Sequence, residues 1–376
     1  MPPDFTMPSD FIMPPDFNRE VHCLLGLPFD AINLKAAEQC IRAAAITRTA
    51  YFLSTPNLNF LIASQSDAAF RNSVINSDLS VADGMPIVWI ARLLGIPIRE
   101  RVAGSDIFEQ LRKERPTRLS VYFFGGMEGV AETACRRLNS NASGLICTGF
   151  KYPGFASVQE MSSDENIEAI NASGADFLIV SLGAKKGQSW IEHNRTRISV
   201  PVISHLGAVV NFVAGGVSRA PALIQRAGLE WLWRIKEEPG LWRRYTSDGL
   251  EFLRLLVTRI APYAWFMYWN KPSGRELDSA AIELFDDGGE MIIRLRGAWV
   301  QHNLRPLREC FASPALARRD VRIELEQVTY VDSAFIGLLM LLYGDRKRQG
   351  KQLSVGNMNK RVRQIFRYAC AEFLLD

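Results

Sequence analysis

The chain has 376 residues, with 44 basic and 40 acidic side chains and a formal net charge of +4. This length allows two domains with substantial cores, and the near balance of charge excludes a nucleic-acid binder recognised by charge alone. Six scattered cysteines show neither a CxxC pair nor disulfide-like spacing, and four histidines show no paired-ligand spacing. We therefore expect a reducing, cytoplasmic compartment and no metal site built by the protein.

The amino terminus repeats MPPDFT, MPSDFI and MPPDFN. Prolines beside aspartates disfavour both helix and strand, so residues 1–18 are predicted to be a disordered tail. The segment lacks the basic region and apolar core of a signal peptide. No window of the sequence reaches the roughly 18 apolar residues of a membrane-spanning helix.

Residues 20–220 alternate short apolar runs with helical patterns. This alternation predicts a Rossmann-like α/β domain, in which a largely parallel sheet carries helices on both faces. The expected strands lie near residues 22–26, 50–54, 79–82, 119–124, 145–148, 176–181 and 201–205. The expected helices lie near residues 34–46, 58–76, 86–94, 105–114, 128–139, 165–173 and 188–197.

Residues 221–269 form a mostly helical appendage in which tryptophans and arginines are interleaved. It contains five of the eight tryptophans of the chain: Trp231, Trp233, Trp242, Trp265 and Trp269. Tryptophan with arginine suits a membrane interface, where rings lie at headgroup depth and cations meet phosphates. A solvated charged face over a buried aromatic stripe has the same pattern, and the pattern alone leaves both interpretations open.

The polar stretch NKPSGRELDSA, residues 270–280, is typical of a linker. Residues 281–376 then form a second, small α/β domain. It opens with an alternating strand near 290–300 and ends on a helix near 359–371.

Asp83 is a candidate functional residue because of its place between a predicted strand and a predicted helix. It follows the apolar residues of a predicted strand, and Pro86 suits the first turn of the next helix. Asp83 therefore lies at the carboxyl end of a strand, the edge at which open parallel sheets bind ligands. Its carboxylate is solvated, caps the helix, or takes part in chemistry.

Three further loops fall at the same predicted edge: 54–59, 123–129 and 181–190. Thr55 and Asn57 suit either hydrogen bonding to a sugar or helix capping. Gly125 and Gly126 between a strand and a helix suit either a pyrophosphate or close packing. Their spacing is not GxGxxG, so a nicotinamide dehydrogenase is not favoured.

Residues from about 22 to 250 resemble the WecG/TagA/CpsF family of bacterial glycosyltransferases, glycosyltransferase family 26. The matching stretches are STPN, VADGMPIVW, RVAGSDIFE, FFGGMEGVAE, VSLGAKKGQSWIEHN, GAVVNFVAGGVSRAP, GLEWLWRIKEEP and WRRY. The resemblance implies an inverting transferase that moves a hexose or N-acetylhexosamine from a UDP-sugar to a sugar linked through pyrophosphate to undecaprenol. It implies no metal and no other cofactor.

By this resemblance Asp83 is the catalytic base, which removes the proton of the acceptor hydroxyl. The residues it implies for substrate binding are Thr55, Asn57, Arg101, Gly125, Gly126, Lys186, Gln188, Arg219, Arg234, Arg243 and Arg244. The arginines of the appendage would meet phosphate near the membrane. The chain departs from the family where Gly187 replaces a glutamine associated with donor recognition, and where His205 replaces a small residue. Gln188 substitutes for that glutamine, or the donor differs.

The second domain resembles a STAS domain through YVDSAFIGLLMLL, residues 330–342. The resemblance implies a module that docks a protein partner, and in anti-sigma-factor antagonists the serine matching Ser333 is phosphorylated. Asp332 and Ser333 before an apolar helix are also ordinary helix-capping residues.

The family resemblance implies a glycosyltransferase of exopolysaccharide or cell-surface polysaccharide biosynthesis, which we expect to be cytoplasmic and peripheral on the inner face of the plasma membrane. Its expected partners are a UDP-sugar, a polyprenyl-pyrophosphate glycolipid, the membrane surface and a protein docked through the STAS domain, but not nucleic acid. The alternative is a non-catalytic scaffold or regulatory binding protein that acts through the STAS domain.

Overall fold

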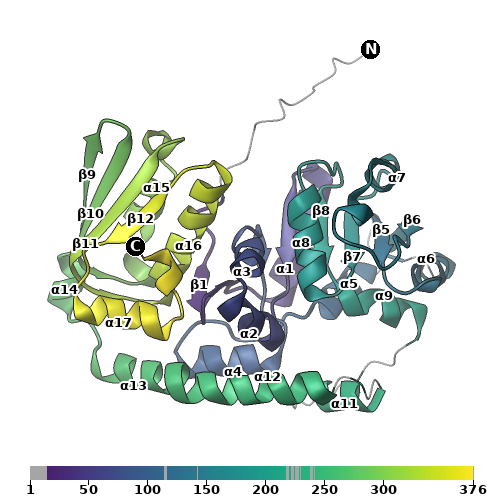
Figure 1. Ribbon diagram of the computed structural model, residues 1–376, viewed down its shortest axis with the longest axis horizontal. Helices are drawn as coiled ribbons and strands as arrows, with labels where there is room; N and C mark the ends of the chain where they lie inside the picture. Colours follow the sequence, from purple (N-terminus) through teal and green to yellow (C-terminus); the bar gives the residue numbers. More distant parts are fainter. Residues whose placement is uncertain are drawn as a thin grey trace. The chain divides into compact units, whose positions relative to one another are not determined.

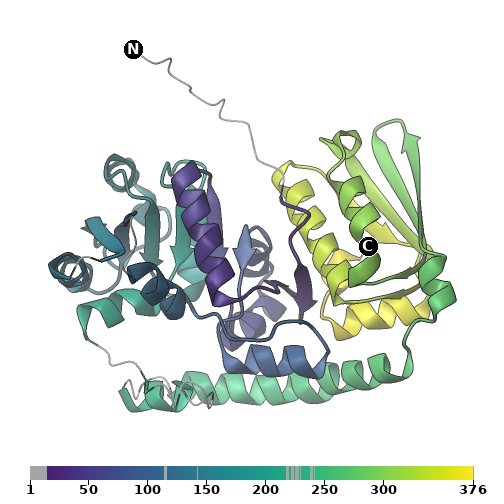
Figure 2. The ribbon, with the colours of Figure 1, turned by 180° about the vertical axis from the view of Figure 1, so that it is seen from behind.

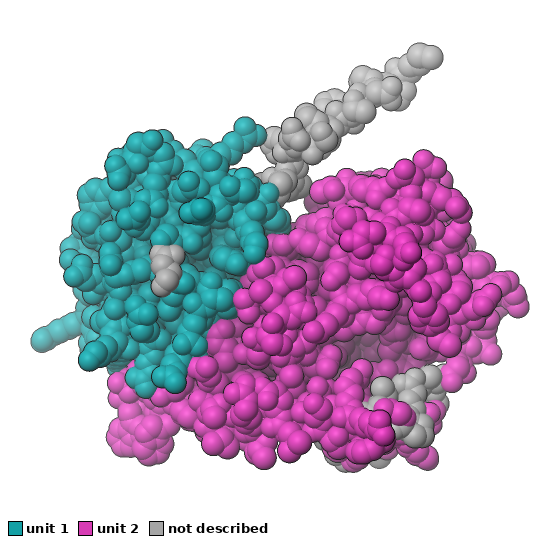
Figure 3. Space-filling view, in the orientation of Figure 1, with its two compact units in different colours: residues 1–19, 271–367, 371–376 teal, residues 20–270, 368–370 magenta. Residues whose placement is uncertain are grey.

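The computed structural model forms two compact units (Figure 3). Unit 1 comprises Met1–Arg19, Lys271–Arg367 and Ala371–Asp376, and unit 2 comprises Glu20–Asn270 and Tyr368–Cys370. The structure describes residues 15–113, 117–141, 143–216, 220–221, 224, 228, 230–237, 240 and 242–375.

The core of unit 2 is a six-stranded parallel sheet with the strand order β4-β3-β8-β7-β5-β6 (Figure 1). Its strands are β3 (Tyr51–Ser54), β4 (Leu79–Ser80), β5 (Leu119–Gly125), β6 (Leu145–Lys151), β7 (Phe177–Ser181) and β8 (Val202–His205). Successive side chains of a strand point to opposite faces, so Val121 and Phe123 belong to one apolar cluster and Tyr122 and Phe124 to another. The expected parallel α/β fold is confirmed.

Helices cover both faces of this sheet, and α8 and α1 lie on opposite faces (Figures 1 and 2). One layer holds α1 (Leu34–Thr47), α5 (Gly104–Arg112), α6 (Val130–Ser140) and α9 (Gly207–Ala214), and the other holds α7 (Asp164–Ala172) and α8 (Ala184–Asn194). Strand β5 thus leads to a helix on one face, while its neighbour β7 leads to a helix on the other. This divergence marks the topological switch point, where sheets of this kind bind ligands.

Two expected elements of unit 2 differ in the structure. The helix expected over 58–76 is two helices, α2 (Leu58–Ser66) and α3 (Ala68–Ile75), because Asp67 caps α3 by accepting the Phe70 N–H at 2.9 Å. The strand expected at 22–26 does not belong to the parallel sheet. It is β1 (Val21–Leu24), which pairs with β2 (Leu27–Asp30) in an antiparallel hairpin. Positive φ angles of 48° at Leu25 and 84° at Gly26 make the turn.

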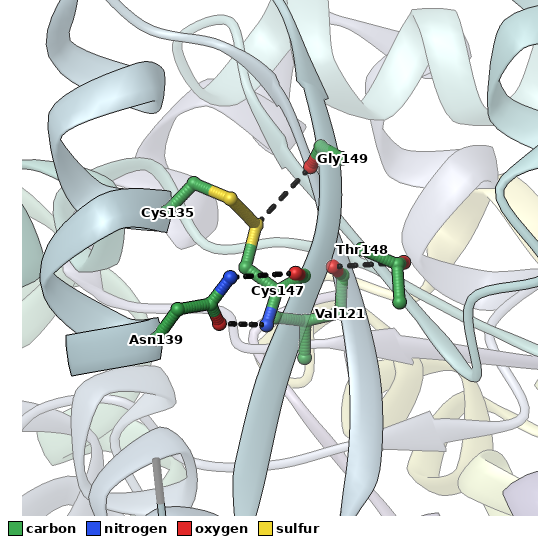
Figure 4. The surroundings of a disulfide bond; sticks show 6 residues. All are labelled: Val121, Cys135, Asn139, Cys147, Thr148 and Gly149. Atoms are coloured by element: carbon green, nitrogen blue, oxygen red, sulfur yellow. Dashed lines mark hydrogen bonds between the residues drawn. A yellow bond between two sulfur atoms is a disulfide. The ribbon is translucent and has the colours of Figure 1, made fainter. Parts of the chain in front are cut away.

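A disulfide joins Cys135 of α6 to Cys147 of β6 (Figure 4). The expectation of unpaired cysteines is wrong for this pair, because α6 packs back on β6 and brings the two Cα atoms to 5.3 Å. Asn139 of the same helix donates to the Cys147 carbonyl at 3.0 Å and accepts from its N–H at 2.8 Å. One covalent bond and two hydrogen bonds therefore fix α6 to the last strand of the sheet.

The appendage consists of α11 (Glu230–Glu237), α12 (Trp242–Leu255), the π-helical stretch η3 (Leu256–Ile260) and α13 (Ala261–Trp269). The wider π turn ends two residues before Pro262, which has no N–H to donate. The exposed fractions are 42% for Trp231, 52% for Trp242, 69% for Trp265 and 65% for Trp269. A buried aromatic stripe is therefore wrong for these four tryptophans.

Unit 1 contains a four-stranded mixed sheet in the order β12-β11-β10-β9. The strands are β9 (Ala281–Asp287), β10 (Glu290–Trp299), β11 (Asp320–Val331) and β12 (Leu353–Gly356), and only β9 pairs in an antiparallel manner. The helices are α14 (Gly274–Asp278), α15 (Arg305–Phe311), α16 (Ser333–Arg348) and α17 (Lys360–Tyr368). Short 3-10 turns are η4 (Gln301–Asn303), η5 (Pro314–Leu316) and η6 (Glu372–Leu374), with η1 (Glu160–Ser162) in unit 2.

Two segments expected to be irregular contain ordered structure. Within the expected linker, Ser273 and Glu276 form a capping box that starts α14. Residues 1–14 of the expected tail lie outside the described residues, but Phe17 is 4% exposed and packs on Phe311 with ring centroids 5.9 Å apart. Arg308 donates to the Phe17 carbonyl. The disordered tail therefore does not extend to residue 18.

Candidate active site

Asp83 lies between β4 and α4 (Met85–Leu93) at the carboxyl edge of the sheet. The chain leaves β4 close to β3, since the Val81 N–H donates to the Ser54 carbonyl at 3.0 Å and the Asp83 N–H to the Pro56 carbonyl at 3.0 Å. The N-cap of α4 is Gly84, with φ 141° and no side-chain capping bond. The carboxylate of Asp83 therefore does not cap this helix.

Three carboxyl groups surround one guanidinium at this position. Arg101 donates to Asp106 at 2.8 Å and to Glu230 of α11. The positive charge of Arg101 also acts on Asp83, which has no ion pair within the part of the chain that the structure describes. Asp106 and Glu230 thus contact Arg101 directly, whereas Asp83 is affected by its charge.

Burial raises the pKa of the Asp83 carboxyl to about 7. The charge of Arg101 opposes this rise, whereas the negative charges of Glu230 and Asp106 add to it. The Gly104 N–H also donates to the carboxyl and lowers its pKa slightly. The result is a half-buried carboxyl that exchanges a proton near neutral pH, which is the range that a general base requires.

Gly104, the first residue of α5, brings Asp83 and Thr55 together. Thr55 is 6% exposed, and its Oγ1 lies 3.5 Å from where a Cβ on Gly104 would stand. The same Cβ would lie 2.4 Å from Cδ2 of Leu206, the residue before α9. Asn57, by contrast, is the N-cap of α2 and accepts the Phe60 N–H at 3.3 Å. Of its two proposed roles, capping is the one that the structure shows.

Gly125 and Gly126 stand at the end of β5, beside the switch point. A Cβ on Gly125 would lie 2.6 Å from the Ser181 carbonyl oxygen of β7, and the Gly126 N–H donates to this oxygen at 2.7 Å. Gly125 is therefore required for packing between strands. A Cβ on Gly126 would make only ordinary contacts, at 3.8 Å and beyond. Gly126 thus offers open backbone at this edge, but its N–H is already in use.

Comparison of the sequence with models of protein families identifies the family. The model of the Glycosyl transferase WecG/TagA/CpsF family matches residues 22–264. The chain belongs to this family. A second match, described as Mlab, STAS domain, covers residues 283–375. The WecG/TagA/CpsF match thus contains the whole parallel sheet, the Asp83 cluster and most of the appendage.

Three curated relatives of this glycosyltransferase share the name N-acetylglucosaminyldiphosphoundecaprenol N-acetyl-beta-D-mannosaminyltransferase. The protein from Bacillus spizizenii is 27% identical over 197 residues, which are 52% of this chain and 75% of the relative. The protein from Bacillus subtilis strain 168 is 24% identical over 201 residues, with the same two shares. A Staphylococcus aureus protein is 21% identical over 224 residues, 59% of this chain and 85% of the relative.

The α8 residues of this glycosyltransferase that were expected at the donor lie in different surroundings. Lys186 donates to the Ala156 carbonyl at 3.0 Å and is exposed. Gln188 is fully buried, and its amide nitrogen donates to Ser54 Oγ at 3.2 Å. The amide oxygen of Gln188 has no hydrogen-bond partner among the described residues. Gln188 therefore points into the interior and not to the surface at which a donor would arrive.

The appendage arginines are spread along two helices. Arg234 of α11 is half-buried, whereas Arg243 and Arg244 of α12 are exposed. The Arg243 guanidinium lies 5.7 Å from the Trp242 ring centroid, and the Arg244 guanidinium 5.1 Å from the Tyr245 centroid. Burial raises the pKa of Asp248, and the positive charge of Arg244 opposes this rise. Among the described residues, neither Arg243 nor Arg244 pairs with a carboxylate of the Asp83 cluster. Arg219 lies outside the described residues.

Glu230 is a site residue that the sequence patterns do not indicate. It pairs with Arg101 across 129 residues of chain. Its signal was its place in GLEWLWR, one of the stretches that carry the family resemblance. Asp106 likewise lies in RVAGSDIFE.

Within residues 15–375, apart from the undescribed gaps, no three His, Cys, Asp or Glu side chains are grouped so that they could hold a metal ion. A search of the described helices finds none with the length and apolar character needed to cross a bilayer. In the STAS domain, Ser333 begins α16 and is 6% exposed. Asp332 caps this helix by accepting the N–H groups of Ala334 and Phe335, both at 2.9 Å.

Proposed function

We propose that this protein is an inverting glycosyltransferase that moves a hexose or N-acetylhexosamine from a UDP-sugar to a sugar carried on undecaprenyl diphosphate. Family membership supports glycosyl transfer. The names of the relatives support the acceptor, since they describe an N-acetylglucosamine joined through diphosphate to undecaprenol. The product would enter a bacterial exopolysaccharide or another cell-surface polysaccharide.

The mechanism rests on the position of Asp83 at the carboxyl edge of the sheet, where its carboxylate does not cap α4 and burial raises its pKa to about 7. The acceptor hydroxyl oxygen attacks the anomeric carbon of the donor, and its proton passes to the Asp83 carboxylate. The bond from the anomeric carbon to the diphosphate oxygen breaks, and UDP leaves with the electron pair. Attack opposite to the leaving group inverts the anomeric centre. A single carboxylate suffices, because UDP leaves readily without a proton.

Replacement of Asp83 by Asn tests this role. We expect kcat to fall about a hundredfold or more while the affinity for UDP stays within a factor of about two, because the base acts only in the transition state. Turnover is measured with a panel of UDP-sugars and a short polyprenyl-diphosphate glycolipid, and UDP affinity by calorimetry. D164N is the matched control, since Asp164 is an exposed carboxylate of α7. Unchanged turnover in D83N would remove Asp83 from the reaction.

We propose that the appendage holds the protein peripherally on the inner face of the plasma membrane. Trp265, Tyr268 and Trp269 of α13 are 69%, 68% and 65% exposed, and amphipathic rings of this kind favour the headgroup region. The double variant W265A/W269A should sediment much less with vesicles that contain anionic lipid. F155A is the control, because Phe155 is 80% exposed but lies outside the appendage. Equal sedimentation of both variants and the parent would overturn this placement.

Two further parts of the proposal concern regulation and cofactors. The STAS domain would dock a protein partner, and phosphorylation of the buried Ser333 would add charge beside the Asp332 cap of α16. Mass spectrometry of protein from its native cell tests this modification.

Transfer would need no metal, so turnover should persist in excess EDTA. A scaffold without catalysis is the second candidate, and absence of turnover with every donor would favour it.

A further inference from the structure

His205 is a buried histidine whose hydrogen bonding is incomplete. It ends β8 and is 9% exposed. Its Nε2 is buried and has no hydrogen-bond partner among the residues that the structure describes. A buried polar atom without a partner is costly, and such atoms in native proteins call for an explanation.

Two glycines leave room for the imidazole ring. A Cβ on Gly187 of α8 would lie 2.2 Å from His205 Cδ2, so any side chain at position 187 would displace the ring. His205 Nε2 lies between the two glycines, 3.0 Å from a Cβ built on Gly187 and 3.2 Å from a Cβ built on Gly207, the first residue of α9. The atom that lacks a partner thus adjoins the amino terminus of α9.

The amino terminus of α9 is suited to an anion. Its N-cap is Leu206, which makes no side-chain capping bond, and Gly207 and Ala208 are both partly exposed. The Val209 N–H donates to the Leu206 carbonyl at 3.0 Å, so the N–H groups of Gly207 and Ala208 are those that a ligand could meet. Such groups together with the helix dipole favour negative charge. Burial lowers the pKa of His205 to about 4, so the ring is neutral at physiological pH and one of its nitrogens carries a hydrogen to donate.

The position of β8 in the sheet places His205 and the amino terminus of α9 between Asp83 and the switch point. β8 lies between β3, which leads to Thr55, and β7, which borders the switch point. The distance along the edge from β4, beside Asp83, to β5 is roughly 19 Å at the usual strand spacing. A nucleotide-sugar that lies along this edge with its sugar at Asp83 must carry its diphosphate past β8.

We propose that the His205 imidazole and the first-turn N–H groups of α9 bind the diphosphate of the donor. The transferred sugar then points toward Asp83, and the nucleoside points toward the switch point between β5 and β7. This inference rests on the proposed function, and it adds the direction in which the donor lies and a residue that holds it.

Calorimetric titration of the full chain with UDP and with uridine tests the subsite. H205F keeps a planar ring but removes the donor, and should weaken UDP binding roughly tenfold to a hundredfold, as expected for loss of a hydrogen bond to a charged group. Uridine affinity should change by less than about twofold, since uridine has no phosphate. H193F is the matched control, because His193 is exposed on α8. It should bind both ligands as the parent does.

G187A provides a second variant that leaves His205 in the sequence. Its added methyl group displaces the ring, so UDP affinity should fall as in H205F while thermal unfolding shows a folded protein. Parent-like UDP affinity in H205F, or an equal loss for UDP and uridine, would overturn the proposal. These outcomes differ from failure of the proposed function, in which the parent itself binds no UDP and turns over no UDP-sugar.

Discussion

The pH dependence of kcat/KM gives the most direct test of Asp83, because it reports the ionisation of groups in the free protein. Asp83 must be ionised to accept a proton, and its pKa is raised to about 7. We therefore expect kcat/KM to be half maximal near this pH and to fall to about a tenth of its plateau one unit lower. Initial rates between about pH 5.5 and 9, with donor and acceptor both well below their KM values, measure this limb. A rate that stays level below pH 7 would refute the assignment.

Two variants should move the midpoint in opposite directions. Glu230 raises the pKa of Asp83 through its negative charge, so E230Q should lower the midpoint. Arg101 lowers the pKa through its positive charge, so R101Q should raise the midpoint, whatever it does to the height of the plateau. E237Q, on the same helix as Glu230, is the control and should leave the midpoint unchanged. Shifts of the same sign in E230Q and R101Q would contradict the electrostatic account.

The remaining predictions concern stability. The folded pKa of Asp83 is raised from 3.8 to about 7, so the parent loses stability as the pH rises toward 7. In urea unfolding, the free energy of unfolding of D83N relative to the parent should therefore be roughly 3 kcal/mol higher at pH 8 than at pH 5. The same difference between D83N and the parent at both pH values would contradict this prediction. Removal of the disulfide in C135A/C147A should lower the free energy of unfolding by roughly 3 kcal/mol, and the difference should vanish when the parent is fully reduced. D332A should cost about 1 kcal/mol in denaturant titration through loss of the α16 cap, and an unchanged midpoint would dismiss that contribution.

The sequence predicted the central fold well because buried parallel strands are continuous apolar runs separated by helical patterns. The same signal misplaced β1, whose residues Val21–Leu24 are equally apolar but pair locally with β2 across a two-residue turn. Apolar content reports burial and not the identity of the partner strand. Likewise, helical periodicity continued through 58–76, and only the capping bond of Asp67 divides that stretch into two helices.

The site was predictable where it depends on chain order and not where it depends on distant pairing. Asp83 and Thr55 follow adjacent strands, so their proximity could be expected from the sheet. The contact of Glu230 with Arg101 joins segments far apart in the chain, and periodicity carries no information on it. Gln188 was expected at the donor because it neighbours Gly187, but one step along a helix turns a side chain by about 100°. In the structure that turn buries it against Ser54.

The hydrogen atom that serves as the side chain of Gly104 has a consequence for recognising active relatives. Its N–H holds Asp83, while Thr55 and Leu206 close in where a methyl group would otherwise stand. Alanine there would push Leu206, a buried neighbour of His205, out of its place. The residue aligned with position 104 should thus be a simple marker in genome surveys. Chains with glycine at this position can bring Asp83, Thr55 and Leu206 together as in this protein. Chains with a larger residue must arrange these three side chains differently.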